Sequence, residues 1–173
     1  MFSLEAPASQ LMYSTVMLIS TLANGDIVNS GTGFFYEFKV DGERPRQEVV
    51  LVTNKHILSG ADRVKLTLHE AIYVNKESSR VEPGSASFDV TVSTGDFVDH
   101  PRCEDLSAIP IKLVWDEALK LNKKPFYRAI PETIVPGDDT LRELSALEDV
   151  VMAGYPEGMI DATHNFPVLR RGI

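Results

Sequence analysis

The sequence predicts an all-β protein, built as a barrel or a sandwich of short strands. Apolar and polar residues alternate with a period of two in stretches such as 64–68 and 88–92, and residues 49–53 form the apolar run of a buried strand. Turn signals separate these stretches, beginning with Asn24-Gly25-Asp26, a sequence typical of a β-hairpin. Many short strands joined by turns are typical of all-β barrels and sandwiches.

The expected elements follow one another from the N-terminus with little helix among them. Strands are expected at residues 15–19, 31–38, 49–53, 64–68, 88–92, 106–113, 148–153 and 166–173. The polar segments 39–48 and 75–87 contain Asp41-Gly42 and Pro83-Gly84, and we expect them to be loops. Helical character is limited to a single turn near 54–60 and a short stretch at 115–121.

The order of these elements divides the chain into two units of unequal size. Residues 1–113 supply enough strands to close one barrel. Residues 114–136 contain several prolines and are expected to connect this barrel to a second unit. Residues 137–173 offer too few strands to close another barrel. We therefore expect the second unit to be incomplete in this sequence, with an open sheet edge.

Composition excludes several classes of partner and compartment. The 173 residues carry 17 basic and 25 acidic side chains, a net charge of −8, which argues against nucleic-acid and anionic-membrane partners. No apolar run approaches the roughly 20 residues that span a bilayer. The single cysteine, Cys103, allows neither an intrachain disulfide nor a cysteine-based zinc cage. No basic residue precedes Lys39, so we expect no secretory signal and a cytoplasmic protein.

Two polar residues stand at the ends of apolar strands, where a rigid scaffold can present chemistry. His56 follows the buried run 49–53, a position that suits a general base or, alternatively, a capping or core histidine. Asp105 opens the apolar stretch 106–113, where it can orient a histidine or simply begin a strand after a turn. Neither residue identifies a function by itself.

Five motifs occur in order along the chain and together carry a resemblance. They are Gly31-Thr32-Gly33-Phe34-Phe35, Val52-Thr53-Asn54-Lys55-His56, His100-Pro101 followed by Asp105-Leu106-Ser107-Ala108-Ile109, Ala153-Gly154-Tyr155-Pro156-Glu157-Gly158, and Arg171-Gly172-Ile173. From about Ser14 onward the sequence resembles the trypsin-like serine peptidases, most closely their disulfide-free bacterial branch. The resemblance implies the chymotrypsin fold, a double six-stranded antiparallel β-barrel, with its second barrel incomplete here. Lys55 stands where the family usually has alanine, a change that an outward-facing side chain tolerates.

The resemblance also implies roles for two residues. His56 would be the general base that takes a proton from a serine hydroxyl and returns it to the leaving amine, and Asp105 would fix the imidazole tautomer. Asp99 is the rival orienting carboxylate, and Asp105 is preferred because the motif Leu106-Ser107-Ala108-Ile109 follows it. The implied activity is endopeptidase hydrolysis of peptide or protein substrates, with no cofactor and no metal.

The nucleophile that the resemblance implies has no counterpart in the sequence. In the family the serine lies in a Gly-x-Ser-Gly-Gly or similar turn, and none of the serines here has that context; Ser107 is expected to face the core. We expect the serine-bearing segment to lie beyond Ile173, and the chain by itself to be inactive. The alternative is a catalytically inactive, protease-like module that binds a peptide or protein partner at an open sheet edge. A regulatory domain of a larger effector is a third reading, and no sensor segment favours it.

Other combinations of reactive residues fit less well. Cys103 precedes Asp105 too closely to serve as a thiol nucleophile for His56. The remaining histidines, at positions 69, 100 and 164, have acidic neighbours but no spacing typical of a metal site. We expect them to have surface or packing roles.

Overall fold

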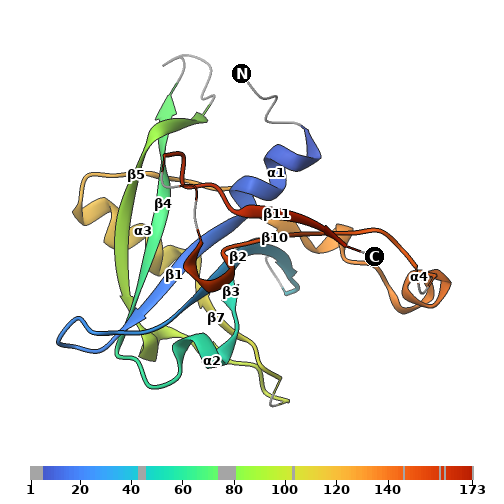
Figure 1. Cartoon of the computed structure of the whole chain (residues 1–173), viewed down its shortest axis with the longest axis horizontal. Helices are drawn as coiled ribbons and strands as arrows, with labels where there is room; N and C mark the ends of the chain where they lie inside the picture. Colours follow the sequence, from blue (N-terminus) through green and yellow to red (C-terminus); the bar gives the residue numbers. More distant parts are fainter. Residues whose placement is uncertain are drawn as a thin grey trace.

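Strands dominate the computed structural model, which describes residues 6–42, 46–73, 81–102, 104–145, 147–159, 161 and 163–172 (Figure 1). The strands are β1 (Thr15–Thr21), β2 (Ile27–Val40), β3 (Arg46–Thr53), β4 (Arg63–Tyr73), β5 (Val81–Ser93), β6 (Val98–Asp99), β7 (Ser107–Pro110), β8 (Pro125–Phe126), β9 (Ile130–Pro131), β10 (Val150–Gly154) and β11 (Val168–Gly172). The helices are α1 (Pro7–Ser14), α2 (Lys55–Leu58), α3 (Ile111–Lys120) and α4 (Asp138–Glu143), with single 3₁₀ turns at Thr94–Asp96, Glu132–Ile134 and Pro156–Gly158.

Most strands belong to one antiparallel sheet with the order β5-β4-β1-β2-β3-β7-β6. Two short strands join it from the side: β8 pairs with β4, and β9 runs parallel to β2. Within the described residues this order is an open path, because β5 and the β7–β6 end are not paired with each other. Helix α3 contacts β5, β3 and β7, so it covers the space between the two ends of the sheet.

One apolar core packs between the strands of this sheet and helices α2 and α3. Its members come from all the long strands and from α2 and α3, and they are 8% exposed or less: Val16, Leu18, Phe35, Leu51, Ile57, Leu58, Val64, Leu66, Leu68, Val90, Val92, Ile109, Val114 and Ala118. The alternation that predicted the strands is the alternation that buries these side chains. The core therefore holds β3 and β7, the two strands that carry the candidate site.

The C-terminal residues form a separate two-stranded hairpin of β10 and β11. Its base contacts β1 and β2, while α4 lies at its outer end, away from the large sheet (Figure 1). The exposed side chains of Val150, Val151 and Met152 show that the core described above does not extend into this hairpin. Residues 114–136, expected as a connector, contribute most of α3 together with β8 and β9, which pack on the large sheet.

Several expected elements differ from those observed. The stretch 106–113 is not one strand: β7 ends at Pro110 and α3 begins at Ile111, earlier than the helix expected at 115–121. The loop expected at 75–87 is wrong for residues 81–87, which extend β5 along β4, while 75–80 lie outside the described residues. Helices α1 and α4 were not expected. None of the helices in the described part of the chain is long and apolar enough to cross a bilayer.

Candidate active site

The turn that carries His56 begins where the buried strand β3 ends. Thr53, the last residue of β3, is 2% exposed, and its hydroxyl donates to the carbonyl of Thr32 on β2 over 2.9 Å. Helix α2 follows, and its Ile57 and Leu58 are both buried in the core. Because its neighbours on both sides are held in this way, the turn presents His56 to solvent, with its side chain 65% exposed.

Asp105 lies just before β7 and meets His56 with both carboxylate oxygens. The backbone N–H of His56 donates to Oδ1 over 3.0 Å, and the ring nitrogen Nδ1 lies 2.6 Å from Oδ2. The side-chain amide of Asn54 donates to the carbonyl oxygen of Asp105 over 3.0 Å and to Oδ2 over 3.3 Å. The pairing of β3 with β7 therefore brings together the two residues that the sequence singled out.

Hydrogen bonds from His56 favour the ionised form of Asp105. The hydrogen bond from the His56 ring, followed by the one from its backbone N–H, holds the pKa of Asp105 below its usual range. The ionised carboxylate can only accept hydrogen bonds, so Nδ1 carries a proton, and in the neutral form of the ring the lone pair lies on Nε2. Nε2 has no hydrogen-bond partner among the described residues. This arrangement can accept a proton from a group that approaches Nε2.

Asp99, the rival carboxylate, binds other partners. It accepts a hydrogen bond from the hydroxyl of Ser107 and lies 3.2 Å from the ammonium of Lys55. The Ser107 hydrogen bond is the main reason that the pKa of Asp99 lies below its usual range, and Lys55 adds to it. Ser107 is 2% exposed. The structure therefore separates the two carboxylates: Asp105 contacts His56, and Asp99 contacts Lys55.

The glycines of the Gly31-Thr32-Gly33 motif leave room for side chains beneath the His56 turn. A Cβ at Gly31 would lie 2.6 Å from Cδ1 of Ile57, and a Cβ at Gly33 would lie 2.8 Å from Cδ1 of Leu51. Both distances are too short for real contacts, so the side chains of Ile57 and Leu51 occupy space that a side chain at these two positions would need.

Gly154 and Tyr155, from the motif that begins at Ala153, also pack on strand β2. The hydroxyl of Thr32 accepts a hydrogen bond from the backbone N–H of Tyr155 over 2.8 Å, and a Cβ at Gly154 would lie 2.8 Å from that hydroxyl oxygen. The Tyr155 ring is 1% exposed, and its hydroxyl donates to the carbonyl of Asn165 over 3.1 Å. Thr32 thus joins the C-terminal hairpin to the strand beside the His56 turn.

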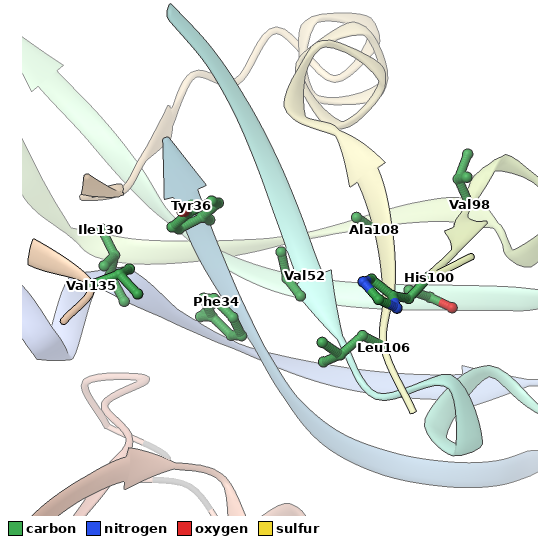
Figure 2. Close-up of a pocket in the computed structure, with 10 residues that line it drawn as sticks. Phe34, Tyr36, Val52, Val98, His100, Leu106, Ala108, Ile130 and Val135 are labelled. Atoms are coloured by element: carbon green, nitrogen blue, oxygen red, sulfur yellow. The ribbon is translucent and has the colours of Figure 1, made fainter. Parts of the chain in front are cut away.

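An apolar cavity of about 420 Å³, which the sequence did not reveal, lies on the outer face of β2, β3 and β7. Figure 2 shows the side chains that line it, and they include Phe34, Tyr36, Val52, Leu106 and Ala108. These residues alternate with core residues along their strands, so the signal was present in the apolar character of both strand faces.

The histidines at positions 69 and 164 have surroundings of their own. His164 contacts Asp161 within one turn, with 2.9 Å between Nδ1 and Oδ2, and His69 is buried at 8% exposure. No group of three or more His, Cys, Asp or Glu side chains in the described ranges is placed to hold a metal ion. No serine hydroxyl of the described residues hydrogen-bonds to His56. Cys103 lies outside the described residues.

No protein-family model matches the sequence, and searches of curated proteins and of solved structures find no match either. The inference of function therefore depends on the geometry around His56 and Asp105.

Proposed function

We propose that the chain carries the general base, His56, and the orienting carboxylate, Asp105, of a trypsin-like serine endopeptidase. In this proposal the main sheet is the first barrel of a chymotrypsin-type double barrel, and the β10–β11 hairpin begins the second. The nucleophilic serine comes from a segment outside these 173 residues, so the chain alone is inactive. Its single cysteine agrees with a protein of a reducing compartment, the cytoplasm.

The observation that supports this proposal most is the two-point contact between Asp105 and His56. The carboxylate binds both the ring Nδ1, at 2.6 Å, and the backbone N–H, at 3.0 Å, which fixes the ring tautomer and the ring orientation together. The pairing of β3 with β7 brings the end of β3 and the start of β7, and with them His56 and Asp105, to the same edge of the sheet. The exposed Nε2 faces outward, where a serine from a second barrel can reach it.

In the proposed reaction, His56 removes the proton of the serine hydroxyl as the serine oxygen attacks the peptide carbonyl. Asp105 stabilises the imidazolium that forms and stays ionised. His56 then gives the proton to the leaving amine, and an acyl-enzyme remains. A water molecule, deprotonated by His56, hydrolyses this ester and regenerates the serine. The peptide or protein substrate needs no metal or cofactor for these steps.

The test is to label the protein that the natural reading frame encodes with a fluorophosphonate and to measure its intact mass. The serine oxygen displaces fluoride, and His56 takes up the serine proton, so one adduct is expected. His56→Ala should slow labelling by about 10⁴-fold or more. His164→Ala is the matched control, because His164 also has an aspartate on Nδ1, and it should label at the wild-type rate.

The outcomes separate the two candidate functions. One adduct that depends on His56 and not on His164 supports the peptidase. A product without an adduct, or labelling that is equal in both variants, contradicts it and favours a protease-like module that binds a peptide or protein without cutting it.

A further inference from the structure

A second carboxylate holds the His56 turn in place beside the one that contacts the ring. Asp99 is the last residue of β6 and Asp105 lies just before β7, and the side chain of each contacts the α2 turn. Asp105 binds His56, while Asp99 binds Lys55, the residue immediately before it. On the other side, Asp99 accepts the hydrogen bond of Ser107, two residues after Asp105.

The strand register explains why these groups meet. Ser107 pairs with Asp99 across β6 and β7 and with Thr53 across β7 and β3. The buried Ser107 hydroxyl therefore lies between the strand that leads to His56 and the strand that carries Asp99. The ion pair with Lys55, 3.2 Å long, continues this connection to the first residue of α2.

We propose that Lys55 and Asp99 are positioning residues that keep the imidazole of His56 on the carboxylate of Asp105. This inference rests on the proposed function and adds to it a role for Lys55. The Lys55–Asp99 pair restrains the turn at its first residue, while Ile57 and Leu58 restrain it at its end. With the pair removed, the turn keeps its contacts with Asp105 and the hydrogen bond from the Asn29 side-chain amide to the His56 carbonyl, but Lys55 itself loses its restraint.

The experiment measures His56 in the 173-residue protein by nitrogen-15 NMR. Ring nitrogen shifts give the Nδ1–H tautomer population, and the exchange of that proton with water reports how often the contact with Asp105 opens. In Lys55→Met and Asp99→Asn we expect exchange to be faster by about two- to fivefold, the range of one exposed ion pair. Lys55→Arg keeps a cation within reach of Asp99 and should exchange like the wild type.

Lys65→Met is the matched control. Lys65 pairs with Asp89 over 3.0 Å on β4 and β5, and its side chain is 39% exposed, against 37% for Lys55. A general effect of losing a surface ion pair would appear in both variants, whereas a positioning effect would appear only at Lys55.

Three results would overturn the positioning role: unchanged exchange in Lys55→Met, an equal change in Lys65→Met, or failure of Lys55→Arg to restore the wild-type rate. The test does not depend on catalysis. Suppose that the fluorophosphonate does not label the protein from the natural reading frame, while exchange of the His56 Nδ1 proton is faster in Lys55→Met. The proposed function then fails, and the positioning role of Lys55 stands. If labelling occurs and the exchange rates do not differ, the proposed function stands and the positioning role of Lys55 fails.

Discussion

Gly31→Ala tests whether the glycine motif on β2 determines how closely the His56 turn packs. The new Cβ would lie 2.6 Å from Cδ1 and 2.9 Å from Cγ1 of Ile57, so the side chain or the turn must shift. Ile57 is 8% exposed and packed in the core, which leaves it little space to move.

The magnitude follows from two opposing effects. Overpacking a core costs about 1–3 kcal/mol, and replacing glycine by alanine lowers the entropy of the unfolded chain by the equivalent of about 0.4–1 kcal/mol. We therefore expect the free energy of unfolding to fall by about 1–2 kcal/mol. For a chain of this size the midpoint of thermal unfolding should fall by about 2–8 °C.

The assay is a double-mutant cycle followed by circular dichroism during heating. Ile57→Ala removes Cδ1 and Cγ1, the two nearest atoms, and alone should cost about 2–5 kcal/mol. In the double variant the smaller side chain accommodates the new methyl, so the loss should be smaller than the sum of the single losses by about 1 kcal/mol. Gly95→Ala is the control, since its Cβ would meet nothing closer than the Ser93 hydroxyl at 3.5 Å. Additive losses in the cycle would refute the contact between Gly31 and Ile57 as the cause.

Three further changes test the core, the attachment of the hairpin and the buried histidine. Phe35→Ala, at a residue 1% exposed whose ring stacks on Tyr127 at 4.6 Å, should cost about 3–5 kcal/mol in urea unfolding. Thr32→Val leaves the buried N–H of Tyr155 without an acceptor and should cost about 1–3 kcal/mol, whereas Thr67→Val, which removes an exposed hydrogen bond to Asp89, should cost less. Burial lowers the pKa of His69, so the unfolded chain binds a proton there before the folded chain does. Above the ordinary histidine pKa of about 6.5, His69 should not make the free energy of unfolding depend on pH. As the pH falls below about 6.5, the free energy of unfolding should decrease by at most about 1.4 kcal/mol per pH unit, until the lowered pKa of His69 is passed. In His69→Phe this dependence should vanish.

The sequence predicted the strands well because their signal is local. Alternation at 64–68 and 88–92 marks the first half of β4 and the second half of β5, and the hairpin expected at Asn24-Gly25 joins β1 to β2 with Gly25 at φ +95°. The ends of these strands depend on their partners. Residues 81–87 are polar and contain Pro83-Gly84, yet they continue β5 because β4 extends beside them, past a register shift near His69.

The helices were harder to predict because tertiary contacts stabilise them. In α1, Tyr13 packs edge-on against His69 and Phe126, residues that are far away in the sequence. The start of α3 has a local signal, but the apolar character of residues 106–113 predicted one continuous strand there. Pro110 ends β7, and Ile111, Val114 and Ala118 have the spacing of one helical face.

The candidate site was predictable as two residues and not as a network. The ends of two apolar strands indicated His56 and Asp105, but nothing in the sequence distinguished Asp105 from Asp99 apart from the resemblance. The distinction comes from register: Asp99 pairs directly with Ser107 in the β6–β7 ladder, and this pairing directs its carboxylate to Lys55. Asn54 was missed as a donor to Asp105, although a polar residue at the end of a buried strand was a signal for it.

The comparison of two similar pairs supports the role proposed for the His56–Asp105 contact. His164 and Asp161 are three residues apart, so their contact arises from the geometry of a single turn. His56 and Asp105 are 49 residues apart, and they meet only because β3 pairs with β7 and a short turn directs the ring outward. An exposed ion pair contributes little to folding free energy, so stability does not account for the backbone contact, the Asn54 amide and the adjacent Lys55–Asp99 pair that surround it. Fixing an accessible imidazole in one tautomer and one orientation is instead what proton transfer at Nε2 requires.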